Sequence, residues 1–234
     1  MKLISVNIGR LKTMTYQGRT ITTGIFKSPV SLRVRTLGNN LEGDAQADPR
    51  VHGGPEKAVY AYPSEHYPFW EQRLWIKLAW GAFGENMTTE GLVEEEVCIG
   101  DRYQVGSVIL KVSQPRQPCY KLALRLDRKH MIELFRSSGR SGFYFSVDRE
   151  GELGPNDPIQ RVSKSPNGVT IADVNRLHRE PANSELLERV LAVPDLSLSQ
   201  RKHFEQRQTK PSVVELPDSP PNPASNRAEN QKPS

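Results

Sequence analysis

Short β-like runs follow one another closely up to about residue 163, and this pattern constrains the fold more than any other feature of the chain. Each run spans roughly four to eight residues and is bounded by Gly, Pro, Asn or Asp. The clearest runs are SVNIG, ITTGIF, SLRVRTL, AVYAY, EVCIG, RYQVG and SVILKVS. Short strands at such close spacing are typical of a barrel or sandwich, and they argue against a parallel α/β sheet.

Helices are predicted in two parts of the chain. Within the β-rich region, apolar residues recur at helical spacing after residue 63 and again after residue 127. From about Val169, three segments each begin at a Ser or Thr suited to an N-cap, and Pro181 and Pro194 separate them. The final segment is rich in proline and polar residues, a composition typical of disorder. We therefore expect a mainly β fold with α-helices: a β-barrel domain with flanking helices at 1–165, a three-helix domain at 166–210 and a disordered tail at 211–234.

Charge and cysteine content exclude several classes of protein. The net charge is +5, but the basic residues are scattered and form no known nucleic-acid-binding motif, so we do not expect a nucleic-acid partner. The sequence contains neither a run of about 18 apolar residues nor a secretory signal, so we expect no membrane association. The two cysteines lack the spacing of a zinc site and are too few for a disulfide framework. Unpaired thiols predict a cytoplasmic protein.

The loop LEGDAQADPRVHGGPEK, residues 41–57, combines carboxylates, a histidine and paired glycines. His52 shares this loop with Asp44, and imidazole is the usual proton carrier and ligand near neutral pH. Gly53 and Gly54 permit positive φ and a close approach of the backbone to a ligand. The same residues suit an ordinary turn, so both interpretations stay open.

Two further loops carry candidate binding residues. In GAFGENMTTEG, residues 81–91, Gly84 allows close backbone approach and Asn86 offers both a donor and an acceptor. In RSSGRSGFYFSV, residues 136–147, Arg140 and nearby backbone donors could bind phosphate. A capped surface loop explains the first pattern as well, and a helix ending at a Gly C-cap explains the second.

The stretch VSQPRQPCYKL places Cys119 in a stiff, basic turn. Pro115 and Pro118 fix φ on either side of the turn, which limits the entropy lost in positioning the sulfur. Arg116 can bind an anionic oxygen, and a nearby cation favours the thiolate that binds metals or attacks substrates. A buried, inert cysteine with Arg116 in a salt bridge remains the alternative. Cys98, in the apolar run EVCIG, is interpreted as a structural core thiol.

Taken together, LEGDAQADPRVHGGPEKAVYAYPSEHY, FGENMTTEGL, IGDRYQVG and VSQPRQPCYKL resemble the MOSC domain, the C-terminal domain type of molybdenum cofactor sulfurases, in order and spacing. The match is nearest to the YiiM-like branch, in which a three-α-helix domain follows the MOSC domain. The resemblance covers roughly residues 2–163 and extends into the helical segment. It implies a β-barrel that binds molybdenum cofactor (molybdopterin), a pterin dithiolene that holds one molybdenum.

The resemblance also implies roles for individual residues. Cys119 would be the molybdenum ligand, and Asn86 would contact the pterin or its phosphate. Asp44 and His52 would shape the mouth of the site or relay protons, with Gly53 and Gly54 in the same loop. The amidoxime-reducing relatives carry an arginine where Gly84 stands here. The basic group for the pterin phosphate would then come from another residue, such as Arg116 or Arg140.

The activity that the resemblance implies is reduction of small N-hydroxylated compounds, such as 6-hydroxylaminopurine, to the amino form. Two cysteines cannot hold a four-cysteine cluster, so electrons would come from a separate flavoprotein or ferredoxin-type reductase. The three-helix segment could dock that partner, mediate a homodimer or serve only the fold. Two other functions stay open: a non-catalytic cofactor or sulfur carrier that uses Cys119, and a hydrolase with Cys119 as nucleophile and His52 as base.

Overall fold

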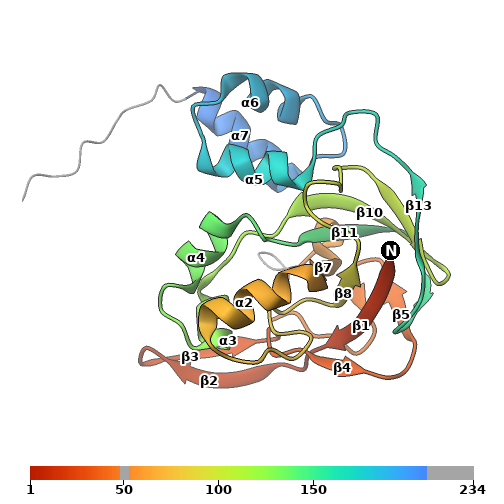
Figure 1. The fold of residues 1–234 in the computed structure, drawn as a ribbon, viewed down its shortest axis with the longest axis vertical. Helices are drawn as coiled ribbons and strands as arrows, with labels where there is room; N and C mark the ends of the chain where they lie inside the picture. The colour runs from red at the N-terminus through yellow and green to blue at the C-terminus, as the bar shows by residue number, and fades with distance from the viewer. Residues whose placement is uncertain (48–52, 210–234) are drawn as a thin grey trace, which may run out of the picture.

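An eight-stranded sheet is the framework of the protein, seen in a computed structural model that describes residues 1–47 and 53–209 (Figure 1). The strands are β1 (Lys2–Ile8), β2 (Lys12–Tyr16), β3 (Arg19–Thr23), β4 (Ser28–Val30), β5 (Val34–Leu37), β6 (Asn40–Leu41), β7 (Val59–Pro63), β8 (Met87–Glu90), β9 (Arg102–Val105), β10 (Val108–Pro115), β11 (Phe143–Arg149), β12 (Gly151–Leu153) and β13 (Ile159–Ser163). The main sheet has the order β13-β9-β10-β11-β7-β8-β1-β4, in which only the β7–β8 pair is parallel. β12-β5-β6 form a smaller sheet, and β2 and β3 form a hairpin.

Some helices connect strands of the sheets, and three further helices follow the last strand, β13. They are η1 (Pro55–Lys57), η2 (Ser64–His66), α2 (Tyr67–Leu74), α3 (Tyr120–Leu126), α4 (Met131–Ser138), α5 (Ile171–Arg179), α6 (Ser184–Leu191) and α7 (Leu198–Thr209). The expected helices after residues 63 and 127 are confirmed as α2 and α4, whereas α3 was not predicted. The expected trio is also confirmed: α5, α6 and α7 form the helical unit at the top of Figure 1. No helix in the described ranges is long and apolar enough to cross a membrane.

The β-rich fold class is confirmed, but the strands do not pair all the way round as a closed barrel. The start of β1 approaches the segment before β13 through one isolated bridge, between Lys2 and Pro158. Two backbone hydrogen bonds flank that bridge, from Leu3 to Asp157 and from Ile159 to Met1, each 3.0 Å long. The sheet therefore curls until its ends meet without a continuous ladder. The predicted strand EVCIG is wrong: this segment forms turns with an isolated bridge at Cys98.

Local sequence signals explain where helices α5 and α6 begin and where helix α4 ends. Thr170 caps α5 in a capping box with Asp173, as the N-cap pattern predicts. Helix α6 is capped by Asn183, one residue before the predicted Ser184. Helix α4 ends at Gly139, whose φ of 70° is the left-handed conformation of a Gly C-cap. This turn directs the chain from α4 into β11.

The helical unit and the sheet share one hydrophobic core. Buried Leu177 of α5, Leu186 of α6 and Phe204 of α7 belong to the same cluster as Val112 of β10. Polar contacts across the boundary strengthen this packing. They are the ion pair of Lys111 with Asp195 at 2.9 Å, the hydrogen bond from Ser197 to Gln114 at 3.0 Å, and that from the Leu198 amide to Glu56 at 2.8 Å. The helical unit is therefore positioned rigidly against the end of β10.

A second core, built from aromatic rings, lies under α2 and α4. Tyr62 of β7 stacks on Phe83 with ring centres 4.3 Å apart, and Trp70 of α2 stacks on Phe135 of α4 at 5.8 Å. The Trp70 indole N–H also donates a hydrogen bond of 2.6 Å to the Tyr62 hydroxyl. These contacts fix α4 beside the segment that follows β10.

Candidate functional site

Cys119 lies where strand β10 passes into helix α3. It occupies the N-cap position of α3 with an extended backbone, φ −127° and ψ 172°. Its carbonyl accepts a hydrogen bond of 2.9 Å from the Leu122 amide, while its side chain makes no capping bond. The residue is partly exposed, and its thiol forms no disulfide. Cys98 is buried as expected, and burial raises the pKa of its thiol.

Arg116 is the most unusual group near that thiol, because it is a buried cation with an unsatisfied donor. Only 5% of the residue is exposed, and its guanidinium carbon lies 5.2 Å from the ring centre of Tyr60 and 5.1 Å from that of Phe135. Its Nη1 atom has no hydrogen-bond partner among the described residues. Burial acts to lower the pKa of Arg116, but Tyr60, Tyr144 and Cys119 raise it above its usual value. The expected alternative, a salt bridge at Arg116, is wrong for the described part of the chain.

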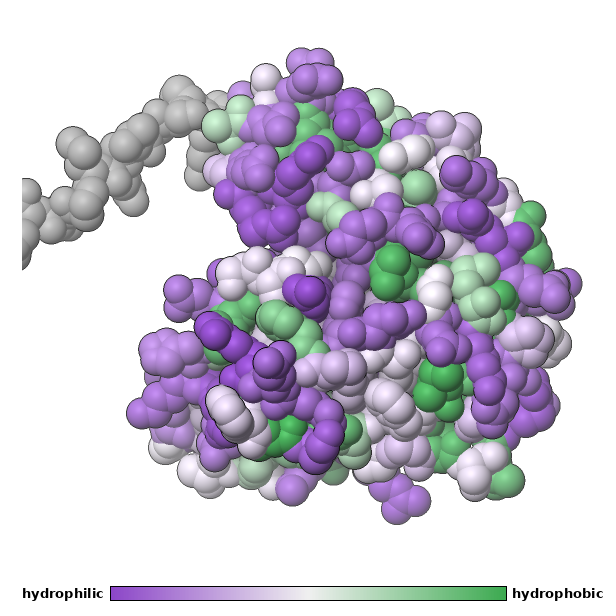
Figure 2. Space-filling model, in the orientation of Figure 1, coloured by the Kyte–Doolittle hydropathy of each residue, from purple (hydrophilic) through white to green (hydrophobic). Residues whose placement is uncertain are grey.

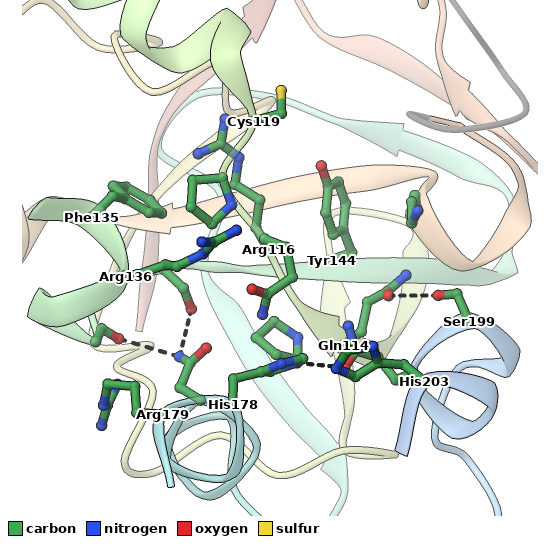
Figure 3. A pocket seen from close by; sticks show the side chains of 18 of the residues that line it. Gln114, Arg116, Cys119, Phe135, Arg136, Tyr144, His178, Arg179, Ser199 and His203 are labelled. Atoms are coloured by element: carbon green, nitrogen blue, oxygen red, sulfur yellow. Dashed lines mark hydrogen bonds between the residues drawn. The ribbon is translucent and has the colours of Figure 1, made fainter. Parts of the chain in front are cut away.

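A cavity of about 640 Å³ opens beside Cys119 and Arg116, between the β-rich part and the helical unit (Figure 3). Its volume lies in the range of small-molecule binding sites, about 300–1,000 Å³. Figure 2 shows a notch in the outline of the molecule where the two parts meet. The helical unit contributes Asn175, His178, Arg179, Ser199, Gln200, His203 and Arg207 to the lining.

A smaller cavity of about 100 Å³ lies on the other side of Cys119. The loops at 23–27 and 44–47 line it together with Gly84. The two cavities share five lining residues, so Cys119 stands at their junction. The shared residues are Lys57, Arg116, Gln117, Cys119 and Tyr144.

Asp44 lines the smaller cavity, but both of its carboxylate oxygens are engaged. One accepts a hydrogen bond of 2.8 Å from the Gly9 amide, and the other contacts Asn86 at 3.0 Å and pairs with Lys27. The side chain of Asp44 is 1% exposed. Burial lowers the pKa of Lys27, and Asp44 partly offsets that effect. In this arrangement Asp44 organises the wall of the cavity, and its predicted part in proton relay stays a prediction.

Gly84 and Asn86 occupy different positions with respect to the cavities. Gly84 lines the smaller one, with φ of 78°, and a Cβ atom there would lie 2.7 Å from Cγ1 of Ile25. Asn86 lines neither cavity. Its Oδ1 accepts a hydrogen bond of 3.2 Å from the Tyr60 amide, and its Nδ2 donates a hydrogen bond to Asp44. The amide of Asn86 is therefore used to hold β7 against the Asp44 loop, and its predicted contact with the cofactor remains a prediction.

The other predicted residues lie away from the junction or outside the described ranges. Gly53 and Gly54 line neither cavity, although Gly54, with φ of 92°, begins the η1 turn that carries Lys57 to the junction. Arg140 also lines neither; its guanidinium carbon lies 4.1 Å from the ring centre of Phe69. His52 falls outside the described residues.

Several cavity residues were not predicted, because nothing in their local sequence distinguishes them. Arg136 lies in the last turn of α4, and Tyr144 belongs to β11, whose sequence pattern indicates only burial. Asn175 and Arg179, and likewise His203 and Arg207, are four residues apart on one helix face, which is the only local signal. The Nε2 atom of His178 donates a hydrogen bond of 2.8 Å to Oε1 of Gln200, and burial is the main cause that lowers the pKa of His178 to about 4.

Comparison with known proteins identifies the two parts of the chain. The MOSC domain model matches residues 48–160, and the model of the YiiM-like, 3-alpha helix domain matches residues 169–208. The protein YflK of Bacillus subtilis is 42% identical over 91% of this chain and 97% of its own length. A protein named Reductase from Gibberella moniliformis is 34% identical, over 76% of this chain and 32% of its own length.

A solved structure shares the whole arrangement. YiiM from Geobacillus stearothermophilus is 37% identical, with a TM-score of 0.75, over 88% of this chain and 97% of its own. The likeness includes both the β-rich part and the helical unit, because it extends over nearly the entire YiiM chain. The chain therefore belongs to the MOSC-domain family, in the YiiM-like branch in which a three-helix domain follows the MOSC domain.

Proposed function

We propose that this protein is a molybdenum cofactor-binding oxidoreductase that reduces N-hydroxylated compounds, with Cys119 as the protein ligand of molybdenum. Membership of the MOSC family supports cofactor binding, and the relative named Reductase supports reductive chemistry. One observation carries the proposal: Arg116, whose buried Nη1 has no hydrogen-bond partner among residues 1–47 and 53–209, lines the same two cavities as the partly exposed Cys119.

The residues at the junction fit an anionic group that also needs a sulfur ligand. A thiolate is a soft ligand suited to a redox metal, and Cys119 offers one. Arg116 would satisfy its Nη1 by donating to an anionic oxygen, in the strong charge-assisted geometry that guanidinium favours. Arg116 and Lys57, which line both cavities, would hold the pterin and its phosphate at the junction beside Cys119. No cluster of three His, Cys, Asp or Glu side chains in the described part of the chain could hold a metal. The remaining metal ligands would come from the cofactor.

The proposed reaction is N–OH plus two electrons and two protons, giving N–H and water. The bound cofactor would supply a two-electron centre that takes up the oxygen of the substrate. Tyr144 lines both cavities, and burial raises the pKa of its phenol although Arg116 acts to lower it. Tyr144 would therefore keep its hydroxyl proton and donate a hydrogen bond to the substrate oxygen. Electrons would come from a separate flavoprotein or ferredoxin-type reductase.

Metal analysis tests the ligand assignment directly. Wild type, Cys119→Ala and Cys98→Ala are purified from a host that makes molybdenum cofactor, and molybdenum and pterin are measured in each. We expect the Cys98→Ala protein to match wild type and the Cys119→Ala protein to hold less than about a tenth of the metal, since one strong ligand is worth at least a tenfold change in affinity. Equal metal content in the two variants would overturn the assignment.

Turnover tests the reaction itself. We expect the loaded wild type to reduce 6-hydroxylaminopurine with an artificial electron donor, and the Cys119→Ala variant to show no reduction above background. A protein that holds molybdenum but reduces no N-hydroxylated compound would be a cofactor or sulfur carrier instead. Activity in metal-free protein would point to a cysteine hydrolase.

A further inference from the structure

The larger cavity carries positive charge well beyond the junction with Cys119. Among the described residues that line it are five Lys or Arg side chains and two histidines, but no Asp or Glu. Arg136 comes from α4, Arg179 from α5 and Arg207 from α7. Three separate helices therefore direct cations into one concave space, which is an arrangement that favours an anionic ligand.

Within the described part of the chain, two of these arginines have no partner that would neutralise their charge. Arg136 and Arg179 form no ion pair and no side-chain hydrogen bond with the described residues, and both are exposed. In Figure 3 they lie on the same side of the cavity as Arg116, with Tyr144 and His203 opposite. Arg207 is held in place by a hydrogen bond of 3.2 Å to the Leu177 carbonyl. Unpaired guanidinium groups on a cavity wall are well suited to bidentate binding of phosphate.

The same cavity offers neutral groups suited to a heterocyclic base. The ring of Tyr144 and the side chain of Gln117 lie at the Cys119 end and line both cavities. An aromatic face allows a base to stack, and an amide offers both a donor and an acceptor to the edge of a base. The cavity therefore combines an aromatic, amide-bearing end beside the thiol with a cationic wall on the side of α4 and α5.

We propose that the larger cavity takes its substrate as a phosphorylated nucleotide, with the base beside Cys119 and Tyr144 and the phosphate at Arg136 and Arg179. The assignment of an N-hydroxylated base as the reacting group rests on the function proposed above. The assignment of a phosphate site rests on the residues of the cavity alone. A concave site of about 640 Å³ suits a small anion and not the flat face of a protein. Arg116 and Lys57 line both cavities at the junction. The proposal assigns the cofactor's own phosphate to that junction and the substrate phosphate to Arg136 and Arg179, which line the larger cavity and not the smaller one.

Direct binding of adenosine 5′-monophosphate tests the phosphate site without turnover. Isothermal calorimetry compares this nucleotide with adenosine on the wild type, Arg136→Gln, Arg179→Gln and the control Arg73→Gln, which removes an exposed arginine of α2 that lines neither cavity. A hydrogen bond to a charged group contributes about 1.5–3 kcal/mol, or roughly a 10- to 150-fold change in affinity. We expect the monophosphate to bind at least about tenfold more tightly than adenosine, and each cavity variant to lose at least about tenfold. Equal affinity for the two ligands, or equal loss in Arg73→Gln, would overturn the proposal.

Kinetics on the loaded enzyme test the substrate class. We expect a lower KM for the N-hydroxylated nucleoside monophosphate than for the nucleoside, and Arg179→Gln should reduce this preference by about tenfold. Molybdenum content should be the same in Arg179→Gln as in wild type; a loss would assign Arg179 to the cofactor and overturn the proposal. If the enzyme reduces no N-hydroxylated compound yet binds the monophosphate through Arg179, the proposed function fails while the phosphate site is supported.

Discussion

The guanidinium carbon of Arg116 lies 5.1 Å from the ring centre of Phe135, so the cation next to Cys119 is held against an aromatic face, and no carboxylate of the described residues pairs with it. Tyr60 contacts it in the same way, at 5.2 Å. Rings attract a cation without competing for its N–H groups. This contact keeps Arg116 in place while leaving its Nη1 donor available to a ligand.

Arg116→Met should separate a binding role from a structural one. An unsatisfied buried donor costs about 1–3 kcal/mol, and cation–π contacts return about 1–2 kcal/mol. We therefore expect the free energy of unfolding of cofactor-free protein to change by less than about 1 kcal/mol, measured by urea denaturation. Molybdenum content in a cofactor-competent host should fall at least about tenfold, while Arg73→Met keeps it. A loss of several kcal/mol of stability with normal metal content would show that Arg116 is structural.

Gly84→Ala should destabilise the protein more than Gly18→Ala. Both glycines have positive φ, 78° and 74°, but a Cβ atom meets Ile25 at 2.7 Å only at Gly84 and has nothing within 4 Å at Gly18. The left-handed conformation alone costs a non-glycine residue about 1–2 kcal/mol. We expect Gly18→Ala to lower the free energy of unfolding by that amount. Gly84→Ala should lower it by at least about 1 kcal/mol more, because the clash with Ile25 adds to the conformational cost. Equal losses in urea denaturation would mean that Ile25 moves aside without cost.

Glu94 should be important for stability because it holds the loop before β11. This buried carboxylate contacts the Nε2 atom of His66 at 2.7 Å and accepts a hydrogen bond of 2.7 Å from the Gly142 amide. Each buried donor that is left without its partner costs about 1–3 kcal/mol. Glu94→Ala should lose an amount of that order in thermal or chemical unfolding, whereas the exposed neighbour variant Glu95→Ala should lose less than about 0.5 kcal/mol. A small loss for Glu94→Ala would contradict this account.

His178 should make stability depend on pH below neutrality. Its pKa is lowered from 6.5 to about 4, mainly by burial; the hydrogen bond with Gln200 acts in the opposite direction, and His203, Arg207 and Arg136 contribute to the lowering. As the pH falls below about 6.5, His178 of the unfolded chain takes up a proton that the native imidazole does not. Protonation stabilises the unfolded state, so the free energy of unfolding decreases between about pH 6.5 and 4. The loss amounts to at most about 3 kcal/mol.

The variant His178→Gln isolates that contribution, because it cannot titrate. Unfolding free energies of the two proteins are measured between pH 7.5 and 4.5, and the wild type should lose more stability than the variant over this interval. Parallel curves for the two proteins would show that His178 does not titrate differently in the folded and unfolded states.

Much of the fold could be predicted because its signals are local. Thr170 and Asp173 form the capping box that their spacing suggests, and Gly139 ends α4 as a C-cap. Other elements escaped prediction because long-range contacts decide them. The apolar run around Cys98 has the pattern of a strand, but its backbone forms only an isolated bridge, with hydrogen bonds to Val169 and Ile171 on either side of Thr170. Helix α3 was missed because its short apolar run follows two prolines and carries no side-chain cap.

The sequence by itself determined that Cys119 sits in a stiff turn beside Arg116, since prolines restrict φ wherever the chain folds. It also determined the family, through motifs whose order and spacing can be read directly. Only the tertiary structure decided which cations line the larger cavity: Arg136, Arg179 and Arg207 do, and Arg140 does not. The physical reason is that a helix presents one face to its neighbours, and packing against the shared core selects which face that is. That selection depends on contacts between residues more than 60 positions apart, such as Leu177 and Val112 in one core, and no local pattern encodes it.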